Sequence, residues 1–181
     1  ADTTTGAWCY YNNDPTKPRL YNWYAVMGIY DSASFSDATL RKEFAPEAWH
    51  VPSDAEWTTL ENHLIANGYN YDGTTTGNMI AKAMASTTGW ISSTVTGAVG
   101  NDQSLNNSSG FNVLPEGIRY DSDGGNGSFY NQGANAFFWT STENDTNYAW
   151  YASLYYKHSH SSQYNHTNGK HYGFSVRLVR D

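Results

Sequence analysis

Side chains that suit ligand contact gather in one stretch of the chain, between residues 148 and 172. This stretch holds six Tyr and four His, and elsewhere the only His are His50 and His63. Tyr offers a large rigid ring and a hydroxyl group at a small cost in conformational entropy. The alternative interpretation is that the rings only cover a sheet, because aromatic residues favour strands. We expect a ligand-binding surface made of Tyr148, Tyr151, Ser153, Tyr155, His158, His160, Tyr164, His166, His171 and Tyr172.

Two features raise the question of a bound metal. His158 and His160 alternate along an extended chain, a spacing that zinc accepts. No cysteine lies in this stretch and no carboxylate lies between Asp145 and Asp181, so chance clustering on an adaptable surface is favoured. The sequence Asp-Ser-Asp-Gly-Gly-Asn at 121–126 resembles the start of a calcium loop but lacks its closing Glu. We therefore expect no metal and no cofactor.

Catalytic chemistry finds little support. Cys9 is the only cysteine, which excludes an internal disulfide and a site built from paired cysteines. The sequence contains no nucleophile elbow. His50, which stands close to Trp49 and Pro52, is a candidate general base. The favoured interpretation is that this His has a structural role. The sequence therefore predicts a binding protein and not an enzyme.

Hydrophobic periodicity predicts the strands that would hold the contact residues. A strand expected at 148–156 alternates between two sets of residues, which must point to opposite faces. The set expected in the core is Trp150, Ala152 and Leu154, and the set expected in solvent is Tyr151, Ser153 and Tyr155. A last strand expected at 172–179 repeats the pattern with Phe174, Val176 and Leu178.

The clearest helix begins after Ser53. Residues 53–56 form a capping box, in which the Ser53 side chain accepts from the third amide and Glu56 reaches back. Trp57, Leu60 and Leu64 then fall on one face at helical spacing. Gly68 is a natural stop.

The remaining segments complete an α+β pattern. A second helix is expected at 78–85, and residues 20–27 are interpreted as either a strand or a buried helix. From residue 97 onward, loops rich in Gly, Asn and Ser separate short strands, among them 111–114 and 136–140. Two helices followed by a loop-rich antiparallel sheet predict an α+β fold, in one domain over 1–181.

Composition limits the partners and the location. The net charge is −7, charged residues are 15% of the chain, and there is no basic run, so nucleic acid is not an expected partner. No apolar stretch approaches the roughly 20 residues of a membrane span, so direct membrane insertion is not expected. The surface rich in Asn, Thr and Tyr favours an extracellular setting.

Four phrases carry a resemblance to a known family. They are Tyr-Asn-Trp-Tyr-Ala at 21–25, Trp-His-Val-Pro-Ser-Asp-Ala-Glu-Trp at 49–57, Phe-Trp-Thr-Ser-Thr-Glu at 138–143 and Gly-Phe-Ser-Val-Arg-Leu-Val at 173–179. Together they resemble the Fibrobacter succinogenes major paralogous domain, over nearly the whole chain. That family is similar to a branch of the C-type lectin fold, which this resemblance therefore implies. Formylglycine-generating enzymes are a further similar group, but their chemistry needs more than Cys9.

A second resemblance covers the Tyr- and His-rich stretch. Residues 147–154, and residues 170–177 that close the stretch, resemble the variable region of target proteins of diversity-generating retroelements. In that family, adenine-directed mutagenesis rewrites template Asn codons into codons that end in a pyrimidine. Such codons encode Tyr, His, Ser, Asn and Asp, but not Lys, Gln, Glu, Met or Trp. The resemblance therefore implies fixed scaffold positions at Trp150, Lys157, Gln163 and Lys170.

These patterns predict a diversified ligand-binding protein with a variable segment at about 148–172. The expected partner is a protein or glycan on a cell or phage-host surface. The expected location is extracellular, on a cell surface or on a phage virion. The main alternative is an undiversified bacterial adhesin or glycan-binding domain.

Overall fold

A computed structural model describes residues 4–120, 127–165 and 169–181, and the calcium-like sequence at 121–126 lies outside them. Its helices are α1 (Trp23–Val26), α2 (Ser32–Ser36), α3 (Asp54–Ala66) and α4 (Ala81–Met84), with 3-10 turns η1 (Tyr11–Asn13), η2 (Ala38–Leu40) and η3 (Gln103–Leu105). Its strands are β1 (Trp8–Tyr10), β2 (Arg19–Tyr21), β3 (Trp49–His50), β4 (Ile118–Tyr120), β5 (Ser128–Tyr130), β6 (Asn135–Glu143), β7 (Ala149–Tyr155), β8 (Ser162–Tyr164) and β9 (Val179–Arg180). The fold is α+β, as predicted.

The helix α3 forms where the capping box predicts it. The Ser53 side chain accepts a hydrogen bond from the Glu56 amide, and the Glu56 carboxylate accepts one from the Ser53 amide at 2.8 Å. The chain turns out of the helix through Gly68, whose φ of +75° favours glycine. Trp57 and Leu64 are buried on the inner face, and Leu60 is half-buried beside them.

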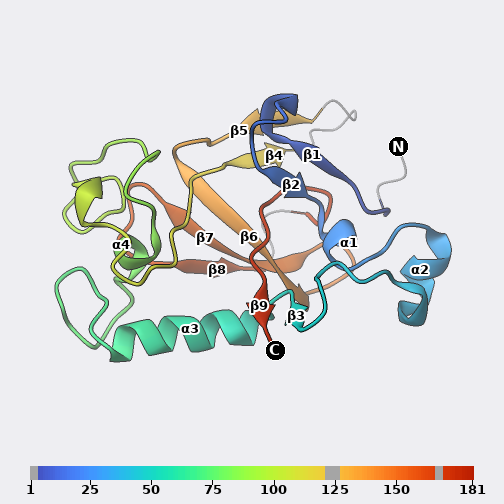
Figure 1. The fold of residues 1–181 in the computed structure, drawn as a ribbon, viewed down its shortest axis with the longest axis horizontal. Helices are drawn as coiled ribbons and strands as arrows, with labels where there is room; N and C mark the ends of the chain where they lie inside the picture. The colour runs from blue at the N-terminus through green and yellow to red at the C-terminus, as the bar shows by residue number, and fades with distance from the viewer. Residues whose placement is uncertain (1–3, 121–126, 166–168) are drawn as a thin grey trace.

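The central sheet has the strand order β6-β7-β8, with every pair antiparallel. Three two-stranded sheets surround it: β1-β2, β4-β5 and β3-β9. In Figure 1, α3 lies along one side of the sheet, whereas the β1-β2 and β4-β5 hairpins lie together on the opposite side. Because the sheet stands between these two layers, both of its faces meet other parts of the chain.

Each face of the sheet packs against its own core cluster. On one side, Ala152 and Leu154 of β7 pack with Trp57 of α3 and Met84 of α4. On the other side the core contains Trp23, Tyr24, Phe137, Trp139, Tyr151 and Phe174. Phe174 stacks on both Trp139 and Phe137, with ring centroids 4.3 Å and 4.9 Å apart.

The second cluster shows that the predicted exposure of one face of β7 is wrong. Tyr151 is only 2% exposed and Ser153 only 7%, although both were expected to face solvent. The alternation itself holds, because Tyr151 and Ala152 belong to different clusters. The error lies in the assumption that one face of the sheet is solvated: β7 is the middle strand, and α1 and Phe174 cover its second face. Trp150, which was expected in the core, is half-buried instead.

The C-terminal segment also differs from the expected strand at 172–179. Only Val179–Arg180 forms a strand, β9, which pairs with β3. Upstream, single bridges join Gly173 to Arg119, Phe174 to Tyr21, and Ser175 to Phe138. The segment thus passes between three elements, which buries Phe174 and leaves Val176 half-buried.

Three other expected elements are shorter than predicted or divided. The helix expected at 78–85 is reduced to α4, and the strand expected at 111–114 is reduced to one bridge from Val113 to Ala85. Residues 20–27 contain both a strand end, in β2, and the helix α1. The Asn22 side chain causes the change, because it accepts a hydrogen bond from the Ala25 amide at 2.9 Å and so caps α1.

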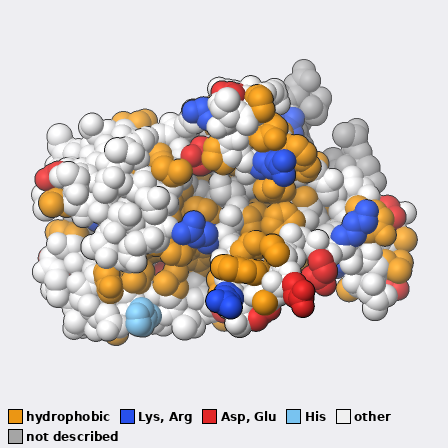
Figure 2. Space-filling model, in the orientation of Figure 1, with side chains coloured by type: hydrophobic (Ala, Val, Ile, Leu, Met, Phe, Trp, Pro, Cys, Tyr) orange, Lys and Arg blue, Asp and Glu red, His pale blue; other side chains and the backbone are white. Residues whose placement is uncertain are grey.

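The visible surface carries few charges. Figure 2 shows hydrophobic side chains gathered over α3 and beside β9, among mostly uncharged polar groups. Among the described residues, no helix has the length and apolar character needed to cross a membrane.

Replacing Tyr151 by Ser should destabilise the fold. The ring packs against Trp139, Phe137 and Phe174, and removing a buried aromatic side chain costs about 3–5 kcal/mol. Tyr164→Ser is the matched control, because Tyr164 pairs with Tyr151 across the sheet but is 37% exposed. It should cost about 1 kcal/mol or less. Chemical denaturation of both variants measures the difference, and equal losses would contradict the assigned burial.

Candidate ligand-binding surface

The ten predicted contact residues differ widely in exposure. Tyr164 and His171 are exposed, whereas Tyr151 and Ser153 are buried and therefore do not offer a contact surface. His166 lies outside the described residues. The half-buried remainder consists of Tyr148, Tyr155, His158, His160 and Tyr172.

Three of the predicted residues meet at one pocket. Tyr148 precedes β7, and His171 and Tyr172 follow the bridge that joins Tyr148 to Gly169. This bridge brings the two ends of the 148–172 segment together. The pocket has a volume of about 330 Å³, and its described lining is Thr4, Tyr24, Phe35, Thr146, Asn147, Tyr148, Gly169, His171 and Tyr172. We call it the Tyr148 pocket.

The turn that presents Tyr148 is held by a carboxylate. Asp145 accepts hydrogen bonds from the amides of Asn147, at 2.8 Å, and Tyr148, at 2.9 Å. These bonds, with that of Asn147 foremost, lower the pKa of the Asp145 carboxyl group. The backbone at the rim of the Tyr148 pocket is therefore fixed by local hydrogen bonds, which limits the entropy lost when a ligand binds.

The aromatic surface continues beyond the predicted segment. The Tyr172 ring lies 4.8 Å from that of Tyr120, which lies 6.1 Å from that of Tyr130. Tyr120 is 40% exposed and Tyr130 is 52% exposed. Both belong to the β4-β5 hairpin, far from residue 148 in sequence, so the composition of the Tyr- and His-rich stretch did not point to them.

A second group of predicted residues lies at the other end of β7. The Tyr155 ring lies 4.8 Å from His158, which stacks on His160 at 4.5 Å. Burial, and then the neighbouring His160, lower the pKa of His158. Tyr148 and Tyr155 are seven residues apart, or about 23 Å along an extended strand. The structure therefore divides the predicted surface into two groups.

The buried side chain of Lys170 holds the connection that leads into Tyr148. Its side chain is 2% exposed, and its ammonium group donates to the Glu143 carboxylate and to the carbonyls of Asp145 and Thr146. It also lies 4.7 Å from the centre of the Trp23 ring. A buried ammonium needs such acceptors, and here they all belong to the β6-β7 connection and the end of β6.

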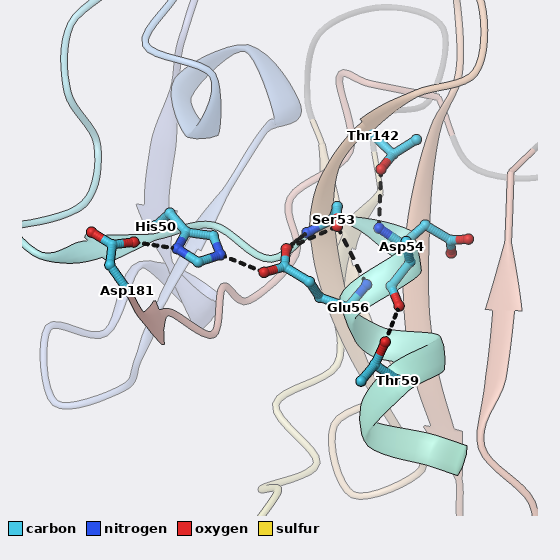
Figure 3. Close-up of polar contacts among 8 residues, drawn as sticks. His50, Ser53, Asp54, Glu56, Thr59, Thr142 and Asp181 are labelled. Atoms are coloured by element: carbon cyan, nitrogen blue, oxygen red, sulfur yellow. Dashed lines mark hydrogen bonds and ion pairs between the residues drawn. The ribbon is translucent and has the colours of Figure 1, made fainter. Parts of the chain in front are cut away.

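His50 links two distant parts of the chain (Figure 3). Its Nδ1 lies 2.6 Å from the Asp181 carboxylate and its Nε2 lies 2.7 Å from the Glu56 carboxylate. Those two hydrogen bonds, with Asp181 foremost, raise the pKa of His50. Ser53 donates to the Glu56 carboxylate, so these groups form a clamp between β3, α3 and residue 181.

The described residues hold no group of three or more His, Cys, Asp or Glu placed to bind a metal ion. His158 and His160 stack face to face with an interplanar angle of 21°. The described lining of the Tyr148 pocket offers aromatic rings together with hydroxyl, amide and imidazole groups.

The fold and the surface together define an α+β domain that carries an aromatic pocket beside its central sheet. The family model for the Fibrobacter succinogenes major domain matches residues 1–180. The chain belongs to this family, which confirms that part of the resemblance seen in the sequence. Searches of the curated proteins and of the solved structures found no match.

Lys170→Met should destabilise the protein by about 2 kcal/mol. Hydrogen bonds to a charged group contribute about 1.5–3 kcal/mol, and the acceptors, which belong to the exposed residues 143, 145 and 146, regain part of this from water. Lys157→Met is the matched control, because Lys157 is exposed and should shift stability by less than about 0.5 kcal/mol. Urea denaturation measures both. A loss no larger than that of the control would show that the ammonium contributes nothing to stability.

The His50 clamp predicts a pH dependence of stability. A folded-state pKa above the unfolded value means that the clamp stabilises the protein fully below the unfolded pKa of 6.5 and loses this effect as pH rises through the folded pKa. The melting temperature of the wild type should therefore exceed that of His50→Gln at about pH 5.5, and the gap should narrow by about pH 9. His63→Gln is the control and should show no such narrowing. A difference in melting temperature between the wild type and His50→Gln that widens as pH rises would contradict the raised pKa of His50.

Proposed function

We propose that this chain is a ligand-binding protein whose contact surface comprises the Tyr148 pocket and the adjoining rings of Tyr120 and Tyr130. The observation that carries the proposal is the meeting of Tyr148, His171 and Tyr172 at one pocket, from opposite ends of the predicted segment. Rigid aromatic rings of this kind give contact area at low entropic cost. The proposed partner is a protein or glycan on a cell or phage-host surface, and the proposed location is extracellular.

We further propose a C-type-lectin-like fold whose segment 148–172 is diversified by a retroelement. Lys170 supports this proposal. Pyrimidine-ending codons cannot encode Lys, and this residue is buried and bonded as a scaffold position requires. Tyr151 and Ser153 narrow the proposal, because their burial excludes free variation there even though such codons encode them. The variable positions proposed are therefore the exposed and half-buried members of the predicted contact set among the described residues: Tyr148, Tyr155, His158, His160, Tyr164, His171 and Tyr172.

An undiversified glycan-binding domain is the second candidate. One observation favours it: the described lining of the Tyr148 pocket contains no Asp, Glu, Lys or Arg. Neutral hydroxyl and amide groups beside aromatic rings suit an uncharged ligand with many hydroxyl groups. The flanking DNA separates the two candidates. A near-copy of the codons for 148–172 that differs only at adenines, beside a reverse transcriptase gene, supports diversification, and its absence favours the adhesin.

The binding surface is tested with any partner returned by a screen against arrays of glycans and bacterial surface proteins. The triple variant Tyr148→Ser, His171→Ser and Tyr172→Ser should bind that partner at least about 30-fold more weakly, since one lost aromatic anchor costs about 2 kcal/mol or more. Its circular dichroism spectrum should stay that of the wild type. Tyr71→Ser is the control, because Tyr71 is 42% exposed and does not line the Tyr148 pocket. Unchanged binding by the triple variant would move the contact surface elsewhere.

A further inference from the structure

A second concave site lies on the opposite side of the sheet from the Tyr148 pocket. It is a groove of about 480 Å³ between α3 and the C-terminal residues 177–179, which we call the α3–β9 groove. Its apolar lining consists of Pro52, Trp57, Leu60, Phe111, Leu178 and Val179. None of its described lining residues lies within 148–172. Its volume and apolar character are those of sites that bind small molecules.

The walls of the groove are held in place by the fold. The capping box fixes the first turn of α3, and β9 pairs with β3 along the other wall. Trp57 is 3% exposed, and its ring packs against Phe111 and Phe138 with centroids 5.7 Å apart in both cases. The groove is therefore formed before any ligand arrives, which reduces the entropic cost of binding.

One cation stands at the groove without an anionic partner. The Arg177 guanidinium lies 4.6 Å from the centre of the Phe111 ring, and its Nη2 donates to the Phe111 carbonyl at 2.5 Å. The ion pairs among the described residues involve only His50, Lys170 and their carboxylate partners, so Arg177 forms none there. A guanidinium has five N–H donors, and further donors are available to a ligand.

The carboxylate among the described lining residues of the groove already has partners within the fold. Glu56 lines the groove, but its Oε1 lies 2.7 Å from His50 Nε2 and its Oε2 accepts from Ser53. A protonated His50 offsets part of this charge, because the same imidazole also pairs with the Asp181 carboxylate. His63, on the same helix, is the remaining titratable group among the described lining residues.

We propose that the α3–β9 groove binds an apolar ligand that carries a carboxylate. The apolar body packs on Leu60, Phe111 and Leu178, and the carboxylate pairs with Arg177, whose planar fork suits two parallel hydrogen bonds. Figure 2 shows the hydrophobic side chains of this region beside Lys or Arg side chains. The proposal is independent of the ligand-binding surface at the Tyr148 pocket, because the two sites share no lining residue.

Isothermal titration calorimetry with decanoate, below its micelle concentration, tests the proposal. Decanoate should bind saturably at one site per chain and at least about 10-fold more tightly than decanamide, its neutral analogue. Arg177→Gln should remove this preference, and Leu60→Gln should weaken both ligands. Arg180→Gln is the matched control: this arginine is exposed in β9, shortly after Arg177 in the chain, does not line the groove, and should leave the preference unchanged.

Several results would overturn the proposal. Absence of saturable decanoate binding removes the site, and equal affinity for decanamide removes the charge recognition. A preference that survives in Arg177→Gln, or binding that is indifferent to Leu60→Gln, places the ligand elsewhere. Circular dichroism checks the fold of each variant. If Arg177→Gln does not fold, the comparison of decanoate with decanamide on the wild-type chain decides the question by itself.

Discussion

The Tyr148 pocket depends on one buried ammonium group. Lys170 is charged, almost inaccessible to solvent, and bonded to three oxygens of residues 143, 145 and 146. Its own backbone carbonyl accepts from the Trp23 amide at 2.8 Å, and its amide donates to Asn147 at 2.9 Å. One residue thus joins α1, the β6-β7 connection and the C-terminal segment. Removing its ammonium group would break the side-chain bonds to residues 143, 145 and 146, whereas the backbone bonds to Trp23 and Asn147 would remain.

The second constraint is the covering of both faces of the central sheet. Its middle strand, β7, gives Leu154 to one core cluster and Tyr151 to the other. In a sheet with one solvated face, that face could serve as a contact surface, whereas neither face of β7 is free to do so. Contact residues are displaced from the strand itself to its two ends, where Tyr148 and Tyr155 stand. The residues of segment 148–172 that belong to the proposed contact surface therefore lie at the ends of β7 or beyond it.

Local signals in the sequence were sufficient for some elements and not for others. The capping box at Ser53 predicted α3, because the capping bonds lie within four residues of one another. In β7 the sequence predicts the burial of Ala152 and Leu154, but not that of Tyr151 and Ser153 on the other face, and Trp150 is only half-buried. The residues that cover that face are Trp23, 128 positions before Tyr151, and Phe174, 23 positions after it. The sequence of β7 itself does not indicate that these residues will cover it.

The candidate surface shows the same limit. Composition identified Tyr148, His171 and Tyr172, which the Tyr148 pocket brings together. It also selected Tyr151, because a buried Tyr and an exposed Tyr have the same identity in a sequence. Tyr120 and Tyr130 escaped notice because each stands alone at the end of a short strand. Their role depends on the ring contact from Tyr120 to Tyr172, which only the folded chain provides.

That contact has a consequence for how selective such a surface can become. If residues 148–172 change between copies of this domain while Tyr120 and Tyr130 stay, every copy keeps two exposed rings at the rim of its site. The repertoire would then be biased from the outset toward ligands with an apolar face to lay against those rings. Mutation would choose among such ligands, and the β4-β5 hairpin would supply a base affinity common to them all. Such copies would bind a narrower range of ligands, each with an apolar face, but more of the copies would bind some ligand.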